Sequence, residues 1–382
     1  GGSREKDKQR PRNRGDQAGT LSGGPWEFQR VLDKKKKGQS FAYWFGPTNV
    51  HRKWIKGSGK ELWGIDPDQL KGKMPAFLPD VHEVRQDLAD YLGEIAAFDA
   101  GLGELIDELK RRGEYDNTLI VVSGDHGPPG FPHGKCNLYD FGTRVSLAIA
   151  GPGVAGGRVV NDFTCLPDLA PTFLDTGKVN APAGMSAKSL WPVLKSKKDG
   201  LVDESRDAVV VGRERHVHSA RPGYLPYPQR AIRTKDHQFI INFKPDRWPL
   251  GDPYRLDGNN EPSFEVLEDK TYVTLADEDA SPTKAWIVSN RMDDKVKPIF
   301  DAVYGKRPRE ELYDLNLDPD QMNNLAAHPK YAQTVKNLRQ RLMDYLAKTN
   351  DPRLVEDGKF YETPPMAGLP KGQRTIEQSI TD

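Results

Sequence analysis

The chain has 382 residues, enough for one large domain with an appendage or for two domains. Hydrophobic residues make up 36% and charged residues 29%, which is the composition of a soluble globular protein. With a formal net charge of +1, no overall field attracts nucleic acid or an anionic membrane, so we expect neither as a partner. Only two cysteines occur, Cys136 and Cys165, and a disulfide scaffold is excluded.

The first hundred residues predict a loop, a short helix, a strand and a long helix. Residues 1–25 lack hydrophobic periodicity and read as loop, and residues 25–32 predict a short helix. Residues 40–45 are a continuous aromatic run, as in a buried strand. In residues 83–113, apolar side chains recur at steps of three and four, which predicts an amphipathic helix that Gly113 would end.

Two short apolar runs follow. Residues 118–123 and 146–150 are typical of buried parallel strands, and residues 166–176 predict another helix. Strands and helices that alternate in this way indicate an α/β fold, a sheet with helices on both faces.

After about residue 205 the pattern changes. Residues 208–212 predict a strand, residues 230–243 a hairpin, and residues 331–346 a second amphipathic helix. Residues 244–300 are rich in loop-forming residues. This part predicts a smaller α+β subdomain with an antiparallel sheet, followed by an extended tail.

Asp125 and His126 directly follow the predicted strand at residues 118–123. Ligands collect beyond the carboxyl ends of strands in open parallel sheets, and a carboxylate with an imidazole there can hold a metal. An ordinary turn with an exposed histidine is the alternative. Lys135, in the next loop, could reach an anionic oxygen as a point charge, or it could be a surface lysine.

Further candidates follow two other predicted strands. His51 comes after residues 40–45, where an imidazole could act as a general acid or simply belong to a loop. Glu214, Arg215 and His216 come after residues 208–212. Arginine suits sulfate, phosphate or carboxylate recognition, although a surface charge cluster is as compatible with the composition.

These motifs occur in an order that resembles the formylglycine sulfatases of the alkaline phosphatase superfamily. The resemblance covers residues 25 to about 352, and its details around residues 134–143 and 227–246 are most similar to the heparan N-sulfatase (sulfamidase)-like branch. The matching motifs are FxPxxxHR at residues 45–52, DNTLIVVSGDHG at 116–127, GKxxxYxxGxR at 134–144 and ELYDLNLDP at 311–319.

The resemblance implies a role for each candidate. Asp125, with His126, would bind a divalent metal, which is normally calcium in this family, although calcium prefers oxygen ligands to an imidazole. Lys135 would contact the sulfate group and the leaving-group oxygen, and His51 would protonate the leaving group. Glu214, Arg215 and His216 would lie near the substrate and shape specificity.

One family motif does not occur in these residues. The Cys/Ser-x-Pro-x-Arg sequence, whose first residue becomes the formylglycine nucleophile, is absent from residues 1–382. We therefore expect the nucleophile upstream of Gly1, and this chain to be a fragment that is inactive alone. The expected divisions are an incomplete catalytic domain (1–204), a C-terminal subdomain (205–350) and an extended tail (351–382).

The resemblance implies a whole enzyme that hydrolyses sulfate esters or sulfamates of sulfated glycans and is periplasmic or secreted. Two alternatives remain at this point. The first is a phosphodiesterase or phosphonate monoester hydrolase of the same superfamily, which shares the metal and lysine. The second is a non-catalytic, glycan-binding remnant.

Overall fold

The computed structural model describes residues 25–363, which divide into two compact units. Within this range, residues 25–74 and 80–116 form the first unit, and residues 75–79 and 117–363 form the second. Helices occur in both units and the described strands in the second, so the predicted α/β class is confirmed. The division at residue 204 stays a prediction, and the loop predicted before residue 25 lies outside the described residues.

The first unit is helical. Its helices are α1 (Pro25–Asp33), α2 (Ser58–Trp63) and α3 (His82–Arg111), with a 3-10 turn at Pro67–Leu70. Glycines let α2 and α3 approach closely, because a Cβ atom on Gly59 would lie 2.2 Å from the carbonyl oxygen of Ala89. This contact packs the first turn of α2 against the long helix.

The long helix α3 ends as predicted. Gly113 has a φ of +67°, and the N–H of the next residue donates to the carbonyl of Leu109 at 2.9 Å, which closes the helix. The predicted apolar stripe is only partly covered: Val84 and Leu105 are buried, whereas Ile95 is 38% exposed. The face that is fully buried instead includes acidic residues and glycine.

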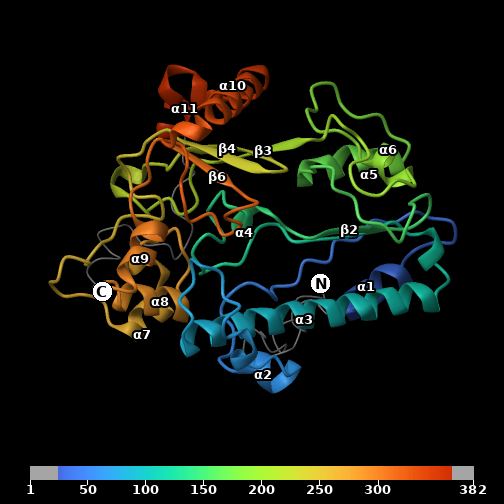
Figure 1. Ribbon diagram of the computed structural model, residues 1–382. Coiled ribbons are helices and arrows are strands. Elements are labelled where there is room, and N and C mark those ends of the chain that lie inside the picture. The colour runs from blue at the N-terminus through green and yellow to red at the C-terminus, as the bar shows by residue number, and fades with distance from the viewer. Residues whose placement is uncertain (1–24, 364–382) are drawn as a thin grey trace, which may run out of the picture. The chain divides into compact units, whose positions relative to one another are not determined.

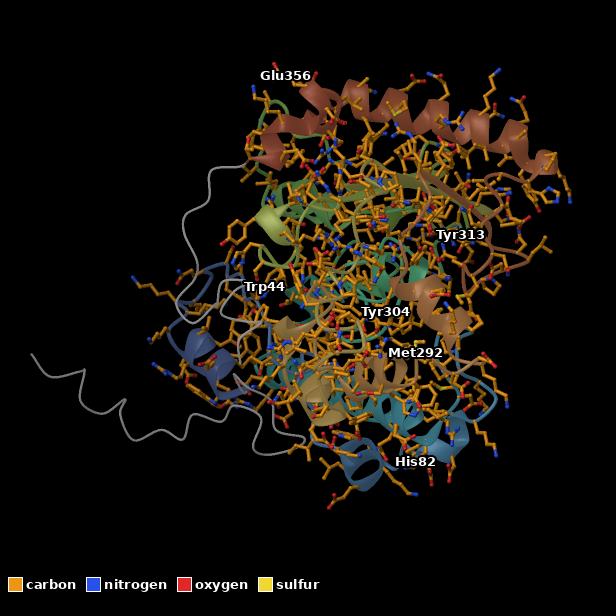
Figure 2. All side chains as sticks on the ribbon, turned by 90° about the vertical axis from the view of Figure 1, so that its left-hand side faces the viewer. Trp44, His82, Met292, Tyr304, Tyr313 and Glu356 are labelled. Carbon is orange, nitrogen blue, oxygen red and sulfur yellow. The ribbon has the colours of Figure 1, made fainter. Side chains whose placement is uncertain are left out.

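The prediction of a strand at residues 40–45 is wrong. These residues form no strand, and Trp44 is 88% exposed (Figure 2). The rings of Phe41 and Tyr43 lie 6.3 and 4.7 Å from that of Phe28 on α1. The aromatic run therefore packs alternate side chains on a helix, while its backbone pairs with no strand in the described part of the chain.

The second unit begins with the strands β1 (Ile120–Ser123) and β2 (Leu147–Ala150), close to their predicted positions. They pair antiparallel, with Ile120 opposite Ala150. The prediction of parallel strands is therefore wrong for this pair. A short apolar run predicts that a strand forms, but it carries no information about the direction of the neighbouring strand.

A four-stranded antiparallel sheet confirms the predicted C-terminal sheet (Figure 1). The hairpin at residues 230–243 forms as expected, and the helix α10 (Ala332–Lys348) packs across the sheet. The strand β6 (Glu310–Asp314) was not predicted. In spatial order the strands are β3 (Ala208–Arg213), β4 (Gln229–Thr234), β5 (His237–Asn242) and β6 (Glu310–Asp314). The core between sheet and helix includes Ile232, Phe239, Leu312, Leu338 and Leu342.

The helices of the second unit are short except for α10. They are α4 (Asp140–Thr143), α5 (Leu169–Thr176), α6 (Trp191–Lys195), α7 (Phe264–Asp269), α8 (Pro282–Ser289), α9 (Lys297–Tyr304), α10 (Ala332–Lys348) and α11 (Lys359–Glu362). Single 3-10 turns lie at Tyr115–Asn117, Leu166–Asp168, Pro222–Tyr224, Thr271–Val273, Pro329–Tyr331, Pro352–Leu354 and Glu356–Gly358. Within residues 25–363, no helix has both the length and the apolar character that a membrane span requires.

Two loop predictions need correction. Residues 244–300 contain α7 and α8, whose N-termini are capped by Ser263 and Ser281 through side-chain oxygens that accept backbone N–H groups. Residues 352–362, at the start of the predicted extended tail, form helical turns, and residues 364–382 of that tail lie outside the described residues. These helices are too short to show a clear apolar period, so capping residues were their main signal in the sequence.

Candidate active site

Asp125 and His126 lie just beyond the end of β1, in the second unit. The Asp125 side chain is 85% exposed, and its Oδ2 lies 3.4 Å from His126 Nε2. His126 Nδ1 lies 2.7 Å from the carbonyl oxygen of Gly127. Because a carbonyl only accepts, Nδ1 carries a hydrogen in this contact, and Nε2 of the neutral ring remains as a possible metal ligand beside Asp125.

These two side chains are an incomplete donor set for a metal. Among residues 25–363, no three His, Cys, Asp or Glu side chains are grouped so that they could hold an ion. Calcium takes six to eight oxygen ligands, whereas this pair offers one carboxylate and one nitrogen. The described residues alone therefore do not fit a calcium site.

The loop that follows places Lys135. A Cβ atom on Gly134 would lie 2.3 Å from the carbonyl oxygen of Pro128, so only glycine permits this close return of the chain. The N–H of Lys135 donates to the same carbonyl at 3.0 Å. The loop is therefore folded tightly on itself, and the position of Lys135 is fixed by its backbone.

Lys135 forms an ion pair that the sequence did not predict. Its Nζ donates to Asp279 Oδ2 at 3.0 Å, and the two side chains are only 13% and 18% exposed. A carboxylate 144 positions away along the chain thus holds the cation that is expected to meet the sulfate group.

His216 lies beside the same run of acidic residues, 277–279, that pairs with Lys135. Its Nδ1 lies 3.9 Å from Asp277 Oδ1. Burial lowers the pKa of His216, Asp277 opposes this effect, and the positive charge of Lys135 adds to it. The structure therefore brings two predicted residues, Lys135 and His216, to one acidic segment formed by residues 277–279.

Asp277 anchors this acidic segment. It is fully buried and accepts hydrogen bonds from Arg213 Nη2 at 2.6 Å, from Arg221 Nη2 at 2.7 Å and from the N–H of Val217 at 2.8 Å. Burial alone would raise its pKa, but the two guanidinium groups hold the pKa below its ordinary value. Asp277 thus remains a carboxylate at neutral pH and fixes the strand end that carries His216.

Lys284 holds the backbone around the acidic segment. This buried side chain donates from Nζ to the carbonyl oxygens of Leu275 at 3.1 Å and Glu278 at 2.9 Å. Burial lowers the pKa of Lys284 to about 8, although the neighbouring acids raise it. The ammonium therefore satisfies backbone groups that would otherwise be buried without partners.

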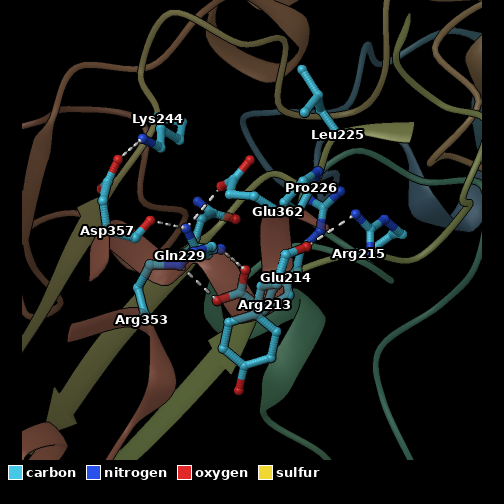
Figure 3. Close-up of polar contacts among 12 residues, drawn as sticks. Arg213, Glu214, Arg215, Leu225, Pro226, Gln229, Lys244, Arg353, Asp357 and Glu362 are labelled. Carbon is cyan, nitrogen blue, oxygen red and sulfur yellow. Dashed lines mark hydrogen bonds and ion pairs between the residues drawn. The ribbon is translucent and has the colours of Figure 1, made fainter. Parts of the chain in front are cut away.

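Glu214 takes part in an ionic network with two arginines, and Arg215 donates to backbone carbonyl groups (Figure 3). Glu214 pairs with Arg230 at 2.8 Å and with Arg353 at 3.2 Å. Arg215 donates to the carbonyl oxygen of Tyr224 at 2.7 Å. The three consecutive candidates thus have different partners. They lie beyond the end of β3 at Arg213, so strand alternation does not set the directions of their side chains. A surface depression nearby is lined by Gly212, Arg213, Glu214, Arg230 and Tyr361.

His51 lies in the first unit, in the loop before α2. Its Nδ1 lies 2.8 Å from the carbonyl oxygen of Arg52. Arg52 in turn donates a hydrogen bond from each of its two terminal nitrogens to Asp87 on α3, at 2.7 and 2.8 Å. The candidate general acid is therefore held by a structured loop.

Sequence reasoning missed the residues that hold these candidates. Asp277, Asp279 and Lys284 lie in a stretch that was predicted as loop, where charged residues are usually solvated. The available signal was the run of three acids at residues 277–279 followed by a lysine in a helix capped by Ser281. On α3, acidic residues interrupt an otherwise apolar pattern, which was the signal for Asp87.

Comparison with known proteins confirms the predicted resemblance. Residues 25–179 match the Sulfatase family model. N-sulphoglucosamine sulphohydrolase of Homo sapiens is 30% identical over 309 residues, which are 78% of this chain and 56% of that protein. An N-acetylglucosamine-6-O-sulfatase of Bacteroides thetaiotaomicron is 26% identical over 314 residues, 80% of this chain and 43% of that protein.

A third relative is similar over a shorter stretch. A Drosophila melanogaster protein described as an extracellular sulfatase is 37% identical over 124 residues, 31% of this chain and 11% of that protein. The chain spans about half the length of the human and Bacteroides relatives. Relatives from animals and from a bacterium thus share sequence with this chain and are described as hydrolases of sulfate groups.

Proposed function

We propose that this chain, which carries a sulfatase-family domain over residues 25–179, is part of an enzyme that hydrolyses sulfate esters or sulfamates of sulfated glycans. The observation that carries the proposal is the convergence of Lys135 and His216 on the carboxylates of residues 277–279. A cation and an imidazole side by side, in a region similar to proteins that act on sulfated glucosamine, suit recognition of a sulfated sugar.

In this proposal each residue has a distinct task. Lys135 stabilises negative charge on the sulfuryl oxygens, and His51 gives a proton to the departing oxygen or nitrogen. His216, oriented by Asp277, lies near the sugar. Glu214, through its ion pairs, and Arg215, through its backbone contacts, shape that region. The formylglycine of the sulfatase family supplies the nucleophile when it is present.

Asp125, with His126 beside it, is proposed to contribute to a divalent metal site. The family resemblance favours calcium, and the exposed Asp125 carboxylate suits it. Since the described residues offer only this pair, further oxygen ligands have to complete the site. We further propose that the whole protein is secreted or periplasmic, which agrees with its similarity to an extracellular sulfatase.

The experiment that tests the function compares substrates and variants in the whole protein. We expect hydrolysis of N-sulfoglucosamine or a glucosamine O-sulfate, and little hydrolysis of an aryl phosphodiester. Lys135→Ala should lower kcat/KM by roughly 10²–10³-fold, as removal of a preorganised charge does. Lys297→Ala is the matched control, because Lys297 pairs with Asp301 on an exposed helix.

Preferential hydrolysis of the phosphodiester would contradict the proposed substrate class. Tight binding of the sulfated sugar without any turnover by the whole protein would instead indicate a glycan-binding protein.

A further inference from the structure

Three acidic residues lie on one buried face of α3. Asp87, Asp90 and Glu94 are spaced by three and four positions, which places them on the same side of a helix. Asp87 and Asp90 are buried, and burial raises the pKa of Asp90 and of Glu94. Buried carboxylates are costly unless they are paired, so their partners indicate what they are for.

All three carboxylates bind the loop that carries His51. Asp87 accepts two hydrogen bonds from Arg52, at 2.7 and 2.8 Å. Glu94 accepts from Asn49 Nδ2 at 2.9 Å. Arg52 and Asn49 are the residues on either side of the dipeptide that contains His51, so the loop is held at both ends.

The third carboxylate fixes the end of the same loop. Asp90 accepts from the N–H groups of Gly57 at 3.0 Å and Gly59 at 2.8 Å, where α2 begins. The close packing of Gly59 on α3 leaves no room for the loop to shift there. Residues 49–59 are thus tied to one helix by three of its carboxylates.

The contact of His51 with its own loop sets the state of its ring. Nδ1 lies 2.8 Å from the carbonyl oxygen of Arg52, which can only accept, so Nδ1 carries a hydrogen. Nε2 is then the nitrogen that faces any other partner. The guanidinium of Arg52 is held by Asp87 and lies 3.8 Å from the ring centre of Trp54, so the residue that orients the imidazole is itself fixed.

We propose that Asp87, Asp90 and Glu94 are positioning residues that hold the His51 loop so that Nε2 delivers a proton to the leaving group. This inference rests on the proposed function. As the bond from sulfur to the leaving oxygen or nitrogen breaks and sulfur bonds to the nucleophile's oxygen, the electron pair stays on the leaving atom. That atom takes the proton from Nε2, and His51 is left as neutral imidazole.

A merely structural role for the three acids predicts a different result from a positioning role. If they only stabilise the first unit, their loss affects all substrates alike. If they act through His51, their loss matters most where the leaving group needs a proton. Sugar sulfates have poor leaving groups, whereas 4-nitrophenyl sulfate has a good one, so the two substrates separate these roles.

The experiment uses the whole protein with the variants Asp87→Ala, Glu94→Ala and Glu94→Gln. We expect Asp87→Ala and Glu94→Ala to lower kcat on the sugar sulfate by about 10–100-fold and on 4-nitrophenyl sulfate by less than about threefold. Glu94→Gln should retain most activity, because its amide oxygen still accepts from Asn49. The control is Glu104→Ala, which removes an exposed acid from the same helix.

Combination with His51→Ala provides the sharper result. Asp87→Ala should cost nothing further on the sugar sulfate once His51 is absent, because both act on one proton transfer. Additive losses, or equal losses on both substrates, would overturn the proposal. If His51→Ala alone has no effect, the general-acid assignment fails instead.

Amide hydrogen exchange on the 382-residue chain decides the positioning itself without any activity. Asp87→Ala should raise exchange across residues 49–59 at least about tenfold relative to Glu104→Ala. Unchanged exchange in this loop would refute the positioning role even if the whole protein is an active sulfatase. Raised exchange in a whole protein without sulfatase activity would support the positioning role of the three acids and refute only the proposed function.

Discussion

Single residues in this protein carry charge into places that exclude water. Asp277 is fully buried between Arg213 and Arg221, and Lys284 is fully buried beneath backbone carbonyl oxygens. A buried ion pair adds little net stability, because desolvation offsets the attraction, but removing one partner leaves the other charge uncompensated. Such residues therefore specify one arrangement of the loops that they join.

Replacement of Asp277 by asparagine tests this arrangement. We expect Asp277→Asn to lower the free energy of unfolding at pH 7 by about 3–5 kcal/mol, because two buried guanidinium groups lose their counter-ion. Chemical denaturation followed by circular dichroism measures the change. Asp301→Asn is the control: Asp301 pairs with Lys297 at the surface, where a pair contributes about 0–1 kcal/mol.

The same variant has a predictable pH dependence. Asp277 has a lowered pKa in the folded state, so its stabilisation is complete above the pKa of the unfolded chain and is lost as pH falls through the folded value. The difference in unfolding free energy between the native protein and Asp277→Asn should therefore shrink below about pH 4. A difference that stays constant down to pH 2 would contradict the charge argument.

At the scale of elements, two glycines of α3 have opposite expected effects. A Cβ atom on Gly93 would lie 2.8 Å from the Cα of Gly59 on α2, whereas one on Gly103 would meet nothing within 4 Å. Gly103→Ala should therefore stabilise the protein by about 0.4–1 kcal/mol through helix propensity and reduced chain entropy. Gly93→Ala should destabilise it by about 1–3 kcal/mol, because overpacking outweighs that gain.

Thermal unfolding of the two glycine variants measures these effects side by side. Because both substitutions add one methyl group to the same helix, propensity is matched, and the difference reports the contact between α2 and α3. Equal shifts of Tm in both variants would show that the two helices do not need this close approach.

The sequence predicted elements where one helix or hairpin carries its own signal. The long helix α3, the hairpin of β4 and β5 and the helix α10 follow from apolar periods and turn residues within short windows. The prediction of a strand at residues 40–45 was wrong, and so was the prediction that β1 is a parallel strand. Strand pairing depends on a partner that lies outside a short window of sequence. The buried acidic residues on α3 were not predicted, because the helix was identified from its apolar side chains alone.

At the scale of the whole molecule, the sequence indicated single candidate residues, but it did not indicate which of them lie together in the fold. Lys135 and His216 were chosen from local motifs, and the fold brings them to one acidic segment. Glu214 and Arg215, chosen from the same motif as His216, pair instead with Arg230 and with the carbonyl oxygen of Tyr224. Which neighbouring side chains converge depends on long-range packing, which is why Asp277 and Asp279 could not be found from spacing.

Calcium binding tests how much of a metal site this chain contains. The described residues offer Asp125 and His126 alone, so the 382-residue chain should bind Ca²⁺ no more tightly than about 1 mM. Asp125→Asn should abolish this binding, and Asp116→Asn, which changes an exposed acid elsewhere, should leave it unchanged. Isothermal titration calorimetry measures each affinity.

Replacement of His126 tests the same metal site in a second way. Because calcium prefers oxygen to nitrogen ligands, His126→Asn should strengthen binding by replacing a ring nitrogen with an amide oxygen beside Asp125. Weaker binding in His126→Asn would mean that the imidazole is itself a ligand and would favour a softer metal such as zinc, whose sites accept histidine. Micromolar calcium binding that survives Asp125→Asn would place the ion elsewhere and would remove the metal role from the end of β1.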